Sequence, residues 1–121
     1  SERRQNFSET DEAVAKKVEQ ALKNNITPLV CVQDKFTPVP QGVNLIAYEP
    51  IFAIGSGNPD TPENANQVAA SFKSVEVLYG GSIDSSNVKG FISEENISGV
   101  LVGNASLDPE EFIRIIKECL G

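Results

Sequence analysis

The sequence predicts an α/β fold in which four parallel strands alternate with helices. Four apolar runs rich in Val, Ile and Leu lack strict alternation, which is typical of strands in a parallel sheet. Amphipathic helical patterns lie before or between most of these runs, and this βα alternation favours a parallel sheet. The 121 residues, 40% of them hydrophobic, form a single unit over residues 1–121 with no linker and no low-complexity segment.

The first helix and the first strand are expected near the N-terminus. In Thr10–Asn24 the apolar residues Val14, Val18 and Leu22 recur at helical spacing, and oppositely charged pairs four residues apart lie on the polar side. The apolar run Thr27–Val32 follows and is predicted as the first strand.

The link to the second strand breaks this rhythm. Gln33–Gly42 contains Pro38 and Pro40 and has no helical periodicity, so we expect it to cross as a loop. It is short for a connection between parallel strands, which normally needs a dozen or more residues. The second strand is predicted at Val43–Tyr48.

Two later helices share one start signal. Thr61–Glu63 and Asp108–Glu111 each give an N-cap residue, a proline at the first helical position and an acidic first turn. A shorter helix is expected over Ser86–Ile92, and the remaining strands are predicted at Val75–Tyr79 and Gly99–Val102.

Composition excludes several classes of function. The net charge of −7 argues against nucleic acid or an acidic membrane surface as a partner, and no apolar run is long enough to span a membrane. Two cysteines form no disulfide framework, and residues 1–6 show no hydrophobic region of a signal peptide, so we expect a cytoplasmic location. The chain has no histidine, which excludes His-based catalysis and most His-containing metal sites from this chain alone. No cofactor and no metal are expected.

The most informative segment of the chain is Ala47–Gly57. Glu49 follows an apolar strand and would stand at its C-terminal rim, where carboxylates in parallel α/β sheets usually face a ligand. Pro50 then precedes a short apolar loop closed by Gly55 and Gly57, whose backbone can approach an anion closely. The pattern indicates a carboxylate beside a lid.

This segment closely resembles the catalytic base and mobile lid of the triosephosphate isomerase family. Three further segments match that family in the same order: Ser1–Arg4 resembles the segment after the fourth barrel strand, Tyr79–Ser82 the loop after the seventh, and Leu101–Leu107 the loop after the eighth. One such motif would be weak, but four in register cover nearly the whole chain. The resemblance implies the C-terminal half of a (β/α)8 barrel, comprising βα units 5–8 and the preceding helix, completed by a partner chain.

The resemblance also assigns roles to residues. It implies that Glu49 is the base that moves a proton between adjacent carbons of a triose phosphate, and that Glu2 organises a catalytic lysine. Backbone N–H groups would cradle the substrate phosphate at Gly55, Ser82, Gly103 and Asn104. The lid and its latch would comprise Pro50, Ile51, Phe52, Ala53, Ile54, Ser56, Gly57 and Tyr79, with the Tyr79 and Ser82 hydroxyls holding the closed lid.

Each of these residues also has a purely structural interpretation. Glu49 could be a solvated strand end, Gly80–Gly81 an ordinary tight turn, and Tyr79 an aromatic side chain that covers the rim. Glu2 could be an exposed terminal charge. For Glu49 the catalytic interpretation is favoured because a proline and a glycine-ended loop follow it.

Two departures from the family pattern concern the start of the lid. Phe52 stands where a tryptophan is usual, so an indole hydrogen bond would be lost. Gln33–Asp34 stands where a glycine–glutamate pair is usual, which is where the partner of that indole would lie. The two changes look mutually compensating.

The family's catalytic lysine and histidine, from the first and fourth loops, have no counterpart in this chain. We therefore expect a two-chain isomerase of glycolysis and gluconeogenesis that interconverts dihydroxyacetone phosphate and glyceraldehyde 3-phosphate. An N-terminal half-barrel chain would supply both residues, and assembled barrels would pair as dimers. The alternative is a non-catalytic isolated or engineered half barrel that self-associates or only binds phosphate. A barrel aldolase or epimerase is disfavoured because no lysine follows a strand end.

Overall fold

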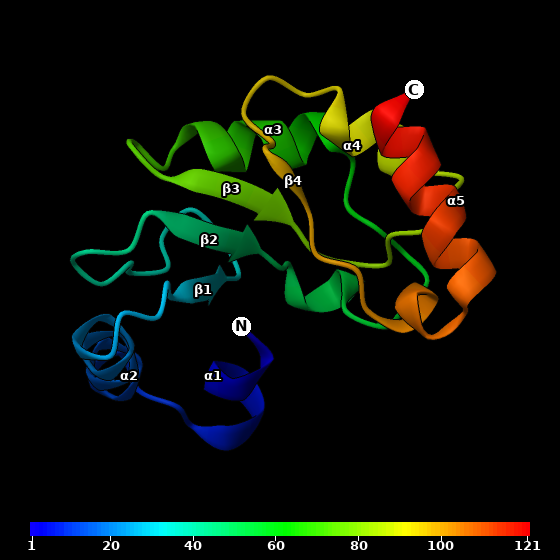
Figure 1. The fold of residues 1–121 in the computed structure, drawn as a ribbon. Helices are drawn as coiled ribbons and strands as arrows, with labels where there is room; N and C mark the ends of the chain where they lie inside the picture. Colours follow the sequence, from blue (N-terminus) through cyan, green and yellow to red (C-terminus); the bar gives the residue numbers. More distant parts are fainter.

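The computed structural model describes residues 1–121 as a four-stranded parallel sheet flanked by helices (Figure 1). The strands are β1 (Leu29–Val32), β2 (Leu45–Tyr48), β3 (Glu76–Tyr79) and β4 (Gly99–Val100). They lie side by side in sequence order, and each neighbouring pair is parallel. The predicted α/β fold with four parallel strands is confirmed, and this strand order is that of consecutive units of a barrel.

Five α-helices and two short 3-10 helices complete the fold. They are α1 (Glu2–Phe7), α2 (Asp11–Lys23), η1 (Ile51–Ala53), α3 (Pro62–Ala70), α4 (Val88–Ile92), η2 (Asn104–Leu107) and α5 (Pro109–Leu120). Side-chain oxygens of Thr10, Thr61 and Asp108 accept hydrogen bonds from backbone N–H groups in the first turns of α2, α3 and α5. Each such cap stabilises a helix by about 1 kcal/mol, which is why these three helices begin where they do.

Each strand is shorter than its apolar run. Val43 is buried and Val75 packs on the core, yet both lie just before the paired strands β2 and β3. An apolar run therefore predicts which residues are buried, and it extends beyond the residues that are hydrogen-bonded in the sheet. The helix expected from Ser86 begins at Val88, because the Asp84 carboxylate accepts a hydrogen bond from the Ser86 N–H at 2.8 Å and forms a turn first.

The sheet is covered on one face only. In β1 and β3 the alternate residues Val32 and Tyr79 are completely buried, whereas Leu29 is 39% exposed and Leu78 is partly exposed. The buried residues face α2, α3, α4 and α5, which Figure 1 shows around the sheet. On the other face Leu29, Leu78 and Glu76 are partly or largely exposed, and only Ala47 of β2 is completely buried. In a complete barrel that face would line the interior.

The link between β1 and β2, residues 33–44, contains no helix, as predicted. The links from β2 to β3 and from β3 to β4 carry α3 and α4. Instead the link folds on itself: the buried Thr37 hydroxyl accepts a hydrogen bond from the Gln33 N–H at 3.3 Å and donates to the Asp34 carboxylate at 3.0 Å. Val39 and Val43 of the link pack on the core. The link thus covers the outer side of the sheet with two valines where the other links use a helix.

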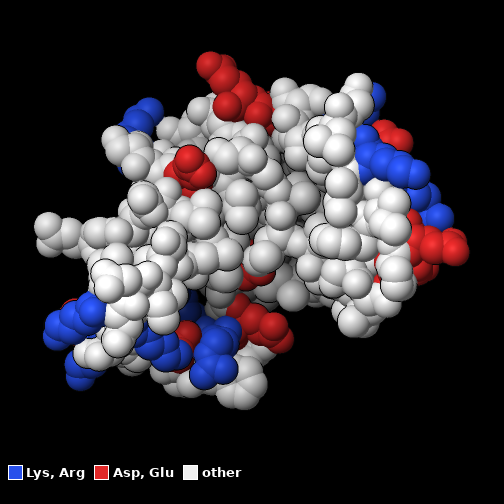
Figure 2. Space-filling model, viewed as in Figure 1, with Lys and Arg blue, Asp and Glu red and all other residues white.

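Charged side chains are few over the strands on the face seen in Figure 2, although β3 carries the exposed Glu76. Lys and Arg lie at the margins of that face, most of them over α1, α2 and α5, whereas Asp and Glu also lie over the sheet. A broad, largely uncharged area lies between them. No helix combines the length and the apolar character that a membrane span requires.

Candidate active site

Glu49 stands at the C-terminal ends of three neighbouring strands. Tyr48 pairs with Tyr79 and Tyr79 with Val100, so the next residues, Glu49, Gly80 and Leu101, follow in one row. A Cβ atom on Gly80 would lie 3.1 Å from Cγ of Glu49 and 3.4 Å from Cβ of Leu101. The glycine therefore leaves the space in which the Glu49 side chain, 21% exposed, turns toward the rim.

A cavity of about 560 Å³ opens beside this carboxylate. Besides Glu49, its lining includes all four residues of the predicted phosphate cradle: Gly55, Ser82, Gly103 and Asn104. These residues come from the loops after β2, β3 and β4. The structure thus brings the predicted base and the predicted phosphate cradle together at one site.

The cradle offers free hydrogen-bond donors. The backbone N–H groups of Gly55, Ser82 and Gly103 donate no hydrogen bond within the chain. Asn104 opens the short helix η2, where the first N–H groups have no partner inside the helix. Ser82 adopts a φ of 53°, which is uncommon for a residue other than glycine and turns the backbone at this point. Several donors on one cavity wall can bind an anion without a cationic side chain.

The Ser82 hydroxyl fixes the middle of the lid. It donates a hydrogen bond to the Ala53 carbonyl at 2.6 Å and accepts one from the Gly57 N–H at 3.0 Å. Ala53, itself a lid residue, is completely buried. The Tyr79 hydroxyl acts farther along the chain, where it accepts a hydrogen bond from the Asp60 N–H at 2.8 Å. Both predicted latch residues therefore contact the lid or its C-terminal end.

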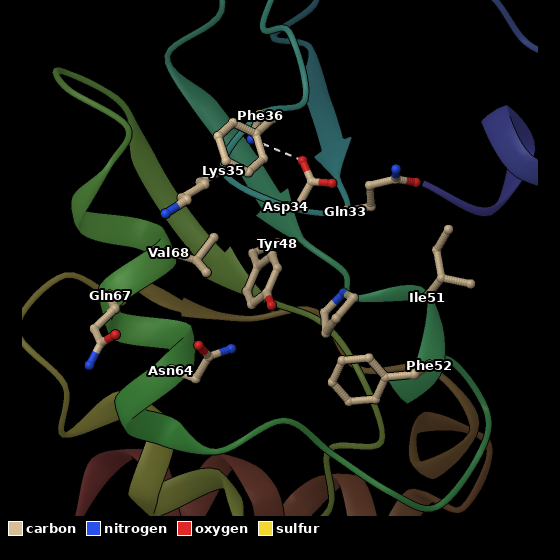
Figure 3. Close-up of a pocket in the computed structure, with 11 residues that line it drawn as sticks. Gln33, Asp34, Lys35, Phe36, Tyr48, Ile51, Phe52, Asn64, Gln67 and Val68 are labelled. Atoms are coloured by element: carbon tan, nitrogen blue, oxygen red, sulfur yellow. Dashed lines mark hydrogen bonds between the residues drawn. The ribbon is translucent and has the colours of Figure 1, made fainter.

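The other lid residues divide between two sides of the molecule. Pro50 and Ala53 are buried, and Ile54 lines the cavity beside Glu49. Phe52 is 61% exposed and faces a second cavity, of about 520 Å³, between the β1–β2 link and α3 (Figure 3). The Ser56 hydroxyl accepts a hydrogen bond from the Asn58 N–H within the lid.

Gly81 provides a test of lid closure. A Cβ atom at this position would lie 2.8 Å from Cβ of Ala53 and 2.9 Å from the Tyr79 hydroxyl, so Gly81→Ala is expected to push the lid off the cavity. Amide hydrogen exchange of the Gly57 N–H should then accelerate roughly tenfold, since its hydrogen bond to Ser82 would break. Gly103→Ala is the matched control, because a methyl group there meets no atom within 4 Å and its φ of −92° lies outside the left-handed region. Unchanged exchange in Gly81→Ala would contradict the closed geometry.

Glu2 does not join the other predicted site residues. It is exposed at the start of α1, its carboxylate accepts a hydrogen bond from the Asn6 amide at 3.4 Å, and it does not line the cavity. Its neighbour Ser1 lies closer to the site, with its backbone nitrogen 3.9 Å from a Glu49 carboxylate oxygen. The Ser1–Arg4 segment thus approaches Glu49 with Ser1 and not with Glu2.

Cys31 belongs to the surroundings of the base. Burial raises the pKa of its thiol to about 12, and the adjacent Glu49 carboxylate adds to the shift. The thiol is therefore protonated at neutral pH, which makes it a poor nucleophile. No group of three or more His, Cys, Asp or Glu side chains is arranged to hold a metal ion.

Sequence reasoning missed Asp60. Its carboxylate accepts a hydrogen bond from the Tyr48 hydroxyl at 2.8 Å, and its N–H donates to the Tyr79 hydroxyl at 2.8 Å. The only signal in the sequence is its place between the lid and the Thr61 N-cap, where an acidic residue is common for reasons of helix capping.

Comparisons with known proteins agree with the geometry. A family model described as triosephosphate isomerase matches residues 1–44 and 41–119. The chain is 43% identical to a triosephosphate isomerase of Leifsonia xyli subsp. xyli (strain CTCB07). That alignment covers 97% of this chain and 58% of the relative. The chain is 36% identical to the triosephosphate isomerase of Caldanaerobacter subterraneus subsp. tengcongensis (97% and 62%) and 38% identical to that of Mesomycoplasma hyorhinis (96% and 58%). The chain thus spans about 60% of the length of the curated relatives it matches.

The alignment with the Leifsonia protein is longer than the chain itself. That alignment extends over 151 residues, although the chain has 121. About 30 positions of the relative are therefore aligned with gaps in this chain. The two segments matched by the family model meet at residues 41–44. Residues 41–44 lie at the end of the β1–β2 link, which is the link without a helix.

Proposed function

Since the chain belongs to the triosephosphate isomerase family, we propose that it supplies the base, the lid and the phosphate cradle of a triose phosphate isomerase. The reaction would interconvert dihydroxyacetone phosphate and glyceraldehyde 3-phosphate. The observation that carries the proposal is the single cavity that Glu49 shares with the free N–H groups of Gly55, Ser82 and Gly103.

This geometry supports a proton transfer between adjacent carbons. The donors would hold the phosphate, which fixes the carbon chain of the substrate relative to Glu49. The carboxylate would take a proton from one carbon and return it to the next, with an enediolate between the two steps. The lid, held over the cavity by Ser82, would exclude water from that intermediate.

The reaction also needs an electrophile at the carbonyl, and this chain contains no histidine. We propose that an N-terminal half barrel supplies the histidine and the lysine and covers the open face of the sheet. Apolar side chains of α5 support such an interface, since Phe112, Ile113, Ile116 and Leu120 are all at least 39% exposed. An apolar stripe of this kind is typical of an interface that is permanently covered. Assembled barrels would then pair as dimers.

Coexpression with the N-terminal half of a curated relative tests this proposal. The chain, the other half and the mixture are compared by native mass spectrometry and by isomerase assay on the same samples. We expect a complex with one copy of each half per barrel and turnover roughly 10²-fold or more above either half alone, because proton-transfer groups lie on both halves. A homodimer of this chain without turnover, in the presence of the other half, would contradict it.

The second candidate is phosphate binding without catalysis. The observation that favours it is a cradle of free donors beside an incomplete catalytic set. Titration of the chain with inorganic phosphate, followed by NMR at Gly55 and Gly103, measures this binding directly. Binding by the chain together with an inactive two-half complex would favour this function over isomerisation.

A further inference from the structure

We propose that the Asp60 carboxylate is a positioning residue that holds the lid closed by binding Tyr48 at the end of β2. The effect on turnover rests on the proposed function, whereas the effect on the lid does not. Asp60 lies between the end of the lid and the N-cap of α3, so it connects a segment expected to move with one that is packed.

Three donors converge on this carboxylate. The Tyr48 hydroxyl lies 2.8 Å and the Asn64 amide nitrogen 2.7 Å from the same oxygen, and the Thr61 N–H lies 2.8 Å from the other. Hydrogen bonds to an ionised acceptor are roughly twice as strong as those between neutral groups. Tyr48 is 3% exposed, and its burial, together with Asp60, raises the pKa of its hydroxyl well above the ordinary value. The hydroxyl thus keeps its proton and acts as the donor.

The backbone of Asp60 makes a second connection. Its N–H donates to the Tyr79 hydroxyl at 2.8 Å, and that hydroxyl donates to the Gly81 carbonyl at 3.1 Å. Tyr79 itself is fixed, because its ring is completely buried and stacks on Phe91 with centroids 4.0 Å apart. Asp60 therefore ties the C-terminal end of the lid to two neighbouring strands, through its side chain to β2 and through its backbone to β3.

The side-chain connection bears directly on the base. Tyr48 immediately precedes Glu49, so the hydrogen bond that holds the end of the lid also fixes the end of the strand that carries the carboxylate. Figure 3 shows Tyr48 of β2 and Asn64 of α3 lining the outer cavity beside the start of the lid. The cavity lies between these two residues and the β1–β2 link. On this side of the sheet, the hydrogen bond from Tyr48 to Asp60 therefore connects the end of the lid to β2.

A simpler role for Asp60 would be to cap α3. That helix already has an N-cap, since the Thr61 hydroxyl accepts a hydrogen bond from the Asn64 N–H at 3.2 Å. The two roles differ in their consequences. Loss of a cap would loosen the first turn of α3, whereas loss of the latch would expose the Gly57 N–H, which is bonded to Ser82 in the closed lid.

Amide hydrogen exchange in the full chain, measured by NMR without substrate, separates these roles. Asp60→Ala and Tyr48→Phe should each accelerate exchange of the Gly57 N–H roughly tenfold, and the double variant should exceed neither single variant by much. Tyr48→Phe leaves the helix cap intact, so the α3 amides should keep their rates. The control Glu63→Gln removes an exposed charge from the same turn and should change nothing.

Unchanged Gly57 exchange in Tyr48→Phe, or acceleration confined to α3 in Asp60→Ala, would overturn the proposal. In the chain assembled with its other half, both variants should lower kcat while leaving the affinity for inorganic phosphate within about twofold, since the cradle is untouched. Faster exchange in the variants, together with an inactive complex of the unmodified chain and its other half, would refute the isomerase function and leave the latch standing. Normal turnover with unchanged exchange would refute only the latch.

Discussion

Replacement of Glu49 by glutamine is expected to lower kcat of the assembled barrel by roughly 10²–10⁴-fold, the usual contribution of a general base. The amide has nearly the same size and cannot accept a proton from carbon. The cradle donors at Gly55, Ser82 and Gly103 stay in place, so affinity for a phosphate-bearing inhibitor should change little. Steady-state kinetics and inhibitor titration on one preparation measure both quantities.

Glu95→Gln is the matched control, because it makes the same change at an exposed position outside the cavity. It should leave both kcat and inhibitor affinity unaltered. Equal losses of turnover and affinity in Glu49→Gln would show that the carboxylate shapes the cavity and does not act as the base.

Replacement of Ile116 by lysine is expected to weaken association with the N-terminal half by roughly 30-fold or more, which corresponds to the ~2 kcal/mol of a strong interface residue. Ile116 lies in the exposed apolar stripe of α5, with Phe112 and Leu120 one turn away on either side. Burying an ammonium group there without a partner is unfavourable. The dissociation constant, measured by titration of one half into the other, gives the effect.

Glu118→Lys places the same side chain on another face of the same helix, where the residue is exposed and polar. Circular dichroism should show unchanged helix content in both variants, so that a lost fold is not mistaken for a lost interface. Equal affinity of Ile116→Lys and the unmodified chain would mean that the stripe of α5 stays uncovered in the complex.

The sequence predicted the strands and the capped helices well because their signals are local. An N-cap, a proline and an acid lie within four residues at the starts of α3 and α5. The apolar runs lack strict alternation, although the structure covers the sheet fully on only one face. A continuous apolar run is typical of a strand that is buried on both faces, as in a complete barrel. The apolar side chains of Leu29 and Leu78 on the open face belong to such runs.

The parts that sequence reasoning missed depend on contacts between distant residues or on weak signals. Asp60 gains its role from Tyr48, twelve positions earlier, and that contact follows from how the lid folds back. Helix α1 was not expected, since it contains no buried residue and so shows no apolar periodicity. The placement of Glu2 followed from family resemblance alone, and the structure leaves this residue outside the cavity.

The shortened β1–β2 link also bears on how the sheet forms. It comprises residues 33–44, whereas the other two links comprise residues 49–75 and 80–98. The free-energy cost of closing a loop is smaller for a shorter loop, by about 0.6 kcal/mol for each halving of its length. β1 and β2 should therefore meet first as the chain collapses, through Leu29 with Leu45 and Val30 with Ile46. The short link that leaves this part of the sheet without a covering helix would thus favour the earliest strand pairing in folding.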